Sequence, residues 1–140
     1  RKTYLGVSIS GTTLSFSSEY YNFTLTKQTP VTAYDASVWN GTWKVTSMTT
    51  NSYSSSDLIL NEILTFSNST YNGTEVSGEV VLVSISYGSV NGTYVFNPTC
   101  QTLIITYTKS PNRKTYLGVS ISGTTLSFSS AHDNFTLKKQ

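Results

Sequence analysis

Charged side chains are scarce in this 140-residue chain: Asp, Glu, Lys and Arg make up 11% of it, against about 25% in an ordinary globular domain. Lys and Arg occur singly or in pairs, and the net charge is only +2. The longest apolar run, Val80–Val83, is far shorter than the roughly 18 residues that a membrane-spanning helix needs. We therefore expect neither a nucleic-acid partner nor a membrane-spanning segment.

Side chains that carry catalysis or bind metals are also few. Cys100 is the only cysteine, so an intramolecular disulfide is excluded, and we expect a buried thiol rather than an intermolecular bridge or a metal ligand. His132 is the only histidine, and in a predicted loop beside Asp133 it does not make a site. Three acids on or beside predicted strands lack a partnering base or nucleophile: Glu62, Glu75 and Glu79. We predict no catalytic, metal or cofactor site, and a protein that is not an enzyme.

Ser and Thr are abundant, at 46 of 140 residues, and one long segment occurs twice. Residues 1–28 and 113–140 agree at 24 of 28 positions, at a fixed offset of 112. Three of the four differences fall together at residues 19–21 and 131–133, in a predicted loop where substitution is tolerated best. Because the offset is a usual domain length, we infer one domain of that size plus a second copy of its last quarter.

Alternating apolar residues predict three short strands in each copy. In KTYLGVSIS, the alternation places Leu117, Val119 and Ile121 on one face, with Tyr116 and Gly118 on the other. The apolar residues expected to form the assembly strands are Leu5, Val7, Ile9, Leu14, Phe16, Phe23, Leu25, Leu117, Val119, Ile121, Leu126, Phe128, Phe135 and Leu137.

The central segments GTWKVTSMT, EVSGEVVLVSISYG, GTYVF and QTLIITYT alternate in the same way, and Asn91-Gly92 has the composition of a hairpin turn. We expect about eight strands from Gly41 to Gln140. The fold class is therefore all-β, a single antiparallel barrel or sandwich with a duplicated three-strand segment. The expected organisation is a duplicated segment over 1–28, a linker over 29–40 and an all-β domain over 41–140.

Sequons of the form Asn-x-Ser/Thr are the one abundant motif, although Pro98 excludes Asn97. Three of them are also Asn-Gly pairs, which turns favour for their own reasons, so glycosylation of an exported protein stays one of two interpretations. The candidate asparagines are Asn22, Asn40, Asn68, Asn72, Asn91 and Asn134.

The segments GTWKVTS, LTFSNSTYNGT and GTYVFNPTCQTLIIT resemble the strand pattern of small lipocalin-like barrels, which begin with a Gly-x-Trp strand, here Gly41 and Trp43. The resemblance covers 41–140. It implies an eight-strand meander that holds a small apolar ligand in the barrel mouth.

The composition as a whole, rich in Ser, Thr, Asn and Tyr and poor in charge, resembles that of archaeal surface thread and pilus subunits. This resemblance implies a β-sandwich that polymerises by donating a strand to the next subunit.

The two copies should compete for one place in the barrel or sandwich, because they bury the same faces. We expect the surplus copy to dock in another subunit or against a neighbouring repeat, so that the partners are copies of the chain itself. The chain is then a slice of a tandem array, a filament subunit or an engineered duplication. The engineered duplication would switch between two arrangements, in which one copy or the other occupies the barrel or sandwich. The first two predict a non-catalytic extracellular structural protein. The alternative is a lipocalin-like small-ligand-binding barrel, possible also as an engineered duplication.

Overall fold

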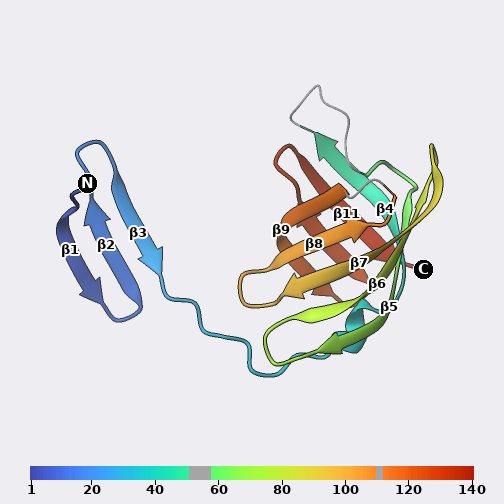
Figure 1. Ribbon diagram of the computed structural model, residues 1–140, viewed down its shortest axis with the longest axis horizontal. Helices are drawn as coiled ribbons and strands as arrows, with labels where there is room; N and C mark the ends of the chain where they lie inside the picture. Colours follow the sequence, from blue (N-terminus) through green and yellow to red (C-terminus); the bar gives the residue numbers. More distant parts are fainter. Residues whose placement is uncertain (51–57, 110–111) are drawn as a thin grey trace. The chain divides into compact units, whose positions relative to one another are not determined.

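The computed structural model describes residues 1–50, 58–109 and 112–140, and divides the chain into two compact units, Arg1–Pro30 and Val31–Gln140. The first unit is a three-stranded antiparallel sheet in the order β1-β2-β3 (Figure 1). Its strands are β1 Leu5–Ser10, β2 Thr13–Ser17 and β3 Asn22–Thr26.

The second unit is a closed barrel of eight antiparallel strands (Figure 1). Each strand pairs with the next one along the chain, and the last pairs with the first. The prediction of an all-β fold with about eight strands after Gly41 is confirmed, and a closed barrel is the form it takes. The strands are β4 Gly41–Thr50, β5 Ile63–Tyr71, β6 Val76–Ser84, β7 Gly88–Asn97, β8 Thr102–Tyr107, β9 Asn112–Ser122, β10 Thr125–Ser129 and β11 Asp133–Lys139.

The barrel interior is filled by side chains that alternate along the strands, as the pleat requires. The Trp39 ring lies 5.1 Å from that of Phe66 and 5.2 Å from that of Tyr94, between ring centroids. The largest fully buried side chains are Trp39, Trp43, Tyr94, Tyr116, Phe66 and Phe135.

A short 3₁₀ helix, η1 Ala36–Trp39, precedes the first barrel strand. The Asp35 carboxylate accepts a hydrogen bond from the Ser37 backbone N–H at 3.0 Å, which caps the helix, and the Trp43 indole donates to the Trp39 carbonyl at 3.0 Å. The sequence placed a linker over 29–40, but residues 31–40 belong to the barrel unit because Trp39 is fully buried in its core.

Asn91 and Gly92 do not form the predicted hairpin turn: both lie inside β7, and the turn between β6 and β7 is at residues 85–87. Gly92 is needed for a different reason. A Cβ placed there would lie 2.6 Å from the Thr106 carbonyl oxygen of the neighbouring strand β8. Glycine at this position therefore permits close approach of two backbones.

In the part of the chain that the structure describes, no helix has the length and apolar character that crossing a membrane requires.

Candidate assembly site

The two copies of the repeated segment adopt the same local structure. In the first, Ile9 pairs with Leu14 and Phe16 with Phe23; in the second, the residues 112 positions later pair in the same register. The turn between the second and third strands also agrees, since Ser18 N–H donates to Tyr21 O at 2.8 Å and Ser130 N–H donates to Asp133 O at 2.8 Å. We call β1–β3 the open sheet and β9–β11 the closing strands.

A β-bulge interrupts the first strand of each copy and reverses the expected alternation. Gly118 has φ +59°, and the pairing register shifts beside it, so one extra residue is inserted between Leu117 and Val119. The prediction that Leu117 shares a face with Val119 and Ile121 is therefore wrong: Leu117 is 56% exposed, whereas Tyr116 and Val119 are buried. An isolated glycine within a strand pattern was the signal for this bulge.

Four side chains that are exposed in the open sheet have counterparts that are buried in the barrel: Tyr4, Val7, Phe23 and Leu25. Val119 is 1% exposed and Leu137 is 0% exposed in the barrel, while Val7 and Leu25 are 61% and 51% exposed in the open sheet. Tyr4 belongs to this apolar face as well, as the counterpart of buried Tyr116, although the sequence placed it on the opposite one. The apolar face of the open sheet thus comprises Tyr4, Val7, Ile9, Leu14, Phe16, Phe23 and Leu25.

Aromatic rings on this face are already assembled as they are in the barrel. Phe16 lies 5.0 Å from Tyr4 and 5.1 Å from Phe23, between ring centroids. In the barrel, the Phe128 ring lies 4.6 Å from that of Tyr116 and 5.5 Å from that of Phe135. The open sheet therefore presents a preformed part of a barrel core, formed by three strands.

The outer edges of the two copies differ. The closing strands are hydrogen-bonded on both sides, β9 to β8 and β11 to β4. Within the described residues, β1 and β3 pair only with β2. Residues 1–4 are not a strand, although the same residues at 113–116 extend β9 along β8. The open sheet therefore exposes two strand edges as well as an apolar face.

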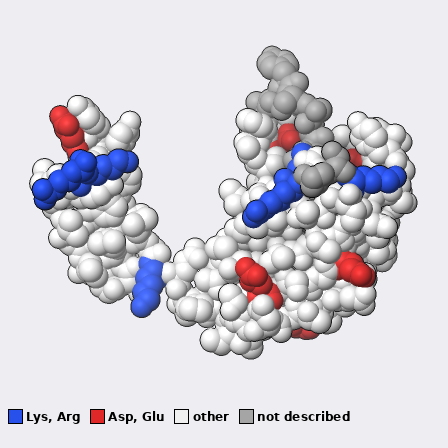
Figure 2. All heavy atoms as spheres, in the orientation of Figure 1, with Lys and Arg blue, Asp and Glu red and all other residues white. Residues whose placement is uncertain are grey.

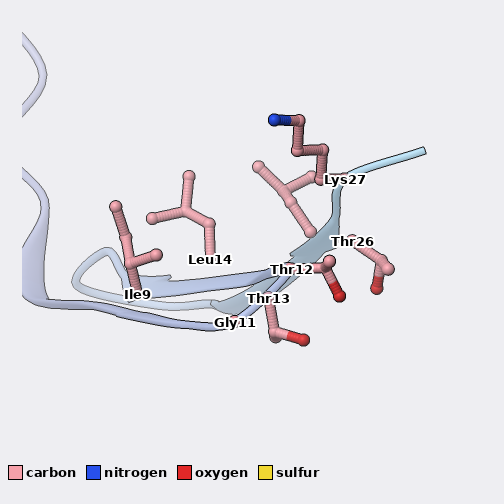
Figure 3. A pocket seen from close by; sticks show the side chains of 8 residues that line it. Ile9, Gly11, Thr12, Thr13, Leu14, Thr26 and Lys27 are labelled. Carbon is pink, nitrogen blue, oxygen red and sulfur yellow. The ribbon is translucent and has the colours of Figure 1, made fainter. Parts of the chain in front are cut away.

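The apolar face forms a shallow hollow of about 300 Å³ between the ends of the three strands. Figure 3 shows Ile9 and Leu14 projecting from one side of the sheet, whereas Thr13 and Thr26 project from the other. Most of the surface visible in Figure 2 is uncharged. Lys27 is the one charged residue that lines the hollow, so the face is suited to apolar burial rather than to electrostatic recognition.

The remaining predicted residues do not converge with this face. Cys100 is exposed in the turn after β7, so the prediction of a buried thiol is wrong; a residue within this turn, at 98–100, has no strand face to bury. His132 is exposed in the loop before β11. Glu62 is buried and accepts hydrogen bonds from the backbone N–H groups of Ile59 at 3.0 Å and Ile85 at 3.2 Å, which gives it a structural role.

The other two acids lie outside the barrel core. Glu79 is exposed on β6 and accepts a hydrogen bond from Asn68 at 2.7 Å, and Glu75 is half-buried just before that strand. Across the described ranges, no three His, Cys, Asp or Glu residues form a group that could hold a metal ion.

All six candidate glycosylation asparagines are exposed, and each is followed two residues later by threonine. Asn72 lies in the turn after β5, where its side-chain oxygen accepts hydrogen bonds from the Thr74 and Glu75 backbone N–H groups at 2.9 and 2.7 Å. Accessibility is what a modified asparagine requires.

Comparison of the chain with protein-family models, with curated proteins and with solved structures found no match.

Proposed function

We propose that the chain is a non-catalytic extracellular structural protein, a subunit or repeat of a filament or surface array, joined to its neighbours through the open sheet. One observation carries the proposal: β1–β3 repeats the register and bulge of the closing strands while its apolar face is exposed. The counterparts of exposed Tyr4, Val7, Phe23 and Leu25 are buried in the barrel. Strand exchange or strand donation between subunits or repeats would cover it.

The energetics favour assembly. Fully burying a Val, Leu, Ile or Phe side chain is worth roughly 1.5–3 kcal/mol, and the open sheet exposes several such side chains at once. Its unpaired edges add backbone groups that can template pairing with another chain. A monomer would keep the apolar face and the unpaired strand edges exposed to solvent.

An extracellular location is part of this proposal and is supported by the sequons. Six exposed Asn-x-Thr sites are spread over both units. If they are modified, the protein carries glycans on the exposed surface of the barrel and of the open sheet. Intact mass and glycopeptide analysis of material from the native source would detect them; unmodified asparagines at all six positions would contradict the glycoprotein part of the proposal.

The assembly role is tested by the particle size of the purified chain as its concentration is raised. Light scattering behind size-exclusion chromatography and negative-stain images should show oligomers or filaments. The double substitution Val7→Asp with Leu25→Asp should weaken association at least tenfold, because it puts charge on the apolar face of the open sheet. The barrel should be unaffected, since its own copies, Val119 and Leu137, are unchanged.

The matched control is the double substitution Ser8→Asp with Thr24→Asp, which adds the same charge at neighbouring positions outside the apolar face. It should associate as the parent does. A monomeric parent chain, or equal loss of association in both double variants, would contradict assembly through the open sheet.

A lipocalin-like binding barrel is the second candidate, favoured by the meander in which β4 opens with Gly41 and buries Trp43. Because large aromatic side chains fill the interior, a ligand would have to displace one of them. Titration with a fluorescent fatty-acid analogue should then change the emission of the buried tryptophans saturably at one site per chain. Unchanged emission at millimolar analogue would argue against this candidate.

A further inference from the structure

The closing strands show which partner fits the open sheet. Their apolar face is covered by the other strands of the same barrel, β4–β8, which we call the five-strand segment. Leu137 lies opposite Val45 of β4, and Tyr116 lies opposite Leu103 of β8. A five-strand segment therefore covers the apolar face of the closing strands and also pairs with both of their outer edges.

One residue that makes contacts outside the apolar face is repeated as well. Lys139 lies over the Trp43 ring, with its Nζ 5.2 Å from the ring centroid, and donates to the Val38 carbonyl at 3.4 Å. Lys27 is its counterpart in the open sheet. The first copy thus retains the lysine that, in the barrel, contacts Trp43 of β4 and Val38 of η1, in addition to the side chains that fill the core.

The number of each part restricts how this face can be covered. The described residues of each chain hold one five-strand segment but two three-strand sheets able to close it, the open sheet and the closing strands. If the open sheet of one molecule displaced the closing strands of another, those strands would be exposed in turn. Exchange among identical chains therefore leaves one three-strand sheet per chain uncovered, either the open sheet or the closing strands. This holds for a ring or fibre of any size.

Face-to-face packing of two open sheets would bury the apolar faces but leave β1 and β3 without strand partners on their outer edges. A five-strand segment without closing strands of its own satisfies both requirements. A further 112-residue repeat placed ahead of the open sheet meets both requirements. It would provide a five-strand segment whose three closing strands are those of the open sheet.

We propose that the open sheet is the closing third of a second barrel, and that its partner is a five-strand segment of the β4–β8 type that carries no closing strands of its own. This inference rests on the proposed function, in which the open sheet joins subunits or repeats, and names the partner as a neighbouring repeat. Successive barrels are then connected by Thr29-Pro30.

The test adds the partner to the intact chain. Residues 29–112 are fused ahead of Arg1, which gives two complete 112-residue periods. The fusion should bind the apolar dye ANS at least tenfold less than the parent chain. Backbone amides of β1 and β3 should gain the protection against hydrogen exchange that β9 and β11 already have. Particle mass should correspond to one fusion chain.

Two matched fusions provide the control. Val7→Asp should restore dye binding and fast exchange in β1–β3, because it introduces a charge into the second core, while Ser8→Asp should not. As a second measurement, the parent chain is refolded with residues 29–112 as a separate polypeptide, and native mass spectrometry should find a one-to-one complex. A chain lacking residues 1–30 should form none.

The outcomes separate the partner from the assembly role. If the parent assembles but the fusion keeps an unprotected open sheet, the five-strand partner is wrong and the assembly role stands. Protection of β1–β3 in the parent alone, as a symmetric dimer, would also overturn the inference in favour of paired open sheets. If the parent is monomeric and the fusion closes two barrels, the inference stands and self-assembly of the chain is contradicted.

Discussion

At the residue scale, the barrel depends on positions whose requirements are steric rather than chemical. Gly92 is buried on β7, where the Thr106 carbonyl of β8 occupies the space that a side chain would need. Gly78 on β6 is in the same situation, since a Cβ there would lie 2.6 Å from the Ser67 carbonyl oxygen. Backbone atoms cannot rotate away as a side chain can, so these contacts restrict the sequence strongly.

Gly92→Ala should therefore lower the free energy of unfolding by about 2 kcal/mol or more, because β7 and β8 must separate to admit the methyl group. Urea denaturation of the barrel unit, followed by tryptophan emission, measures the effect. Ser89→Ala on the exposed side of the same strand is the control and should change stability by no more than about 0.5 kcal/mol. Equal stability of Gly92→Ala and the parent would contradict the close approach of the two strands.

Tyr94 gives the barrel a dependence on alkaline pH. Burial raises its pKa from 10.0 to about 12, against the opposing effect of its hydrogen bond with Ser69. Between these values the unfolded chain loses the proton and the folded chain keeps it, so stability is complete below pH 10 and falls as pH rises toward 12. The loss is at most about 3 kcal/mol.

Denaturation midpoints at pH 9, 10 and 11 should therefore decrease, and Tyr94→Phe should reduce the slope because phenylalanine does not ionise. Tyr34 contributes in the same direction, since burial also raises its pKa. An identical slope in Tyr94→Phe would show that Tyr94 is not the group responsible.

At the element scale, the β-bulge decides which side chains enter the core. Gly6 and Gly118 both have φ +59°, a conformation that glycine adopts without strain. Each inserts one residue, so Tyr and Val flank the bulge on the same side of the sheet. The same feature in two differently covered sheets indicates that the local sequence, rather than the barrel, determines it.

Leu117→Ser should change the free energy of unfolding by no more than about 0.5 kcal/mol, because Leu117 is exposed on the barrel exterior. Val119→Ser should cost about 3 kcal/mol, because it leaves a cavity and buries a hydroxyl group. Thermal melts of the two variants compare them directly. The opposite ranking would indicate that the strand alternates without a bulge.

Much of this element level could be predicted from the sequence. The strand count, the antiparallel meander and the three strands of each copy follow from alternation of apolar residues. Leu117, Gly92 and Trp39 could not be placed, because each depends on a neighbour distant in sequence or on backbone geometry. A bulge moves the following side chains to the other face of the strand without changing the composition. A close approach of backbones depends on the facing strand. The burial of η1 depends on the space at the end of the barrel.

The candidate site was predictable in outline for a related reason. Repetition of residues 1–28 at 113–140 predicts that both segments are able to occupy the same surroundings. Alternation alone could not show that Tyr4 joins the apolar face, or that the closing strands occupy the barrel while the open sheet does not. Cys100 was misplaced because burial of a thiol is a tendency of the residue type, whereas its turn position depends on Asn97 and Pro98.

At the scale of the whole molecule, the chain contains the parts of one barrel and the last third of another. The interior positions of the open sheet and the closing strands are identical in sequence, apart from Asp133 at the start of β11, which is buried while its counterpart Tyr21 is exposed. The two meanders should therefore be interchangeable in the barrel if one is removed.

Truncation after residue 112 tests this balance, because the shortened chain holds one five-strand segment and one meander. It should still unfold cooperatively and retain the near-ultraviolet circular dichroism of buried Trp39 and Trp43, whether closed within one chain or between chains. Light scattering distinguishes those two forms. The same truncation with Val7→Asp should lose the signal; retention in both, or loss in both, would contradict interchangeability.

The position of the last residue has a mechanical consequence. Gln140 N–H donates to the Thr42 carbonyl at 2.9 Å, so the end of β11 lies beside the start of β4. A pulling force applied at Gly41 and Gln140 would open the β4–β11 ladder one hydrogen bond at a time instead of shearing all of them together. In a string of such barrels, tension would reach this ladder once η1, with its fully buried Trp39, is pulled from the core; each barrel would then lengthen by unzipping.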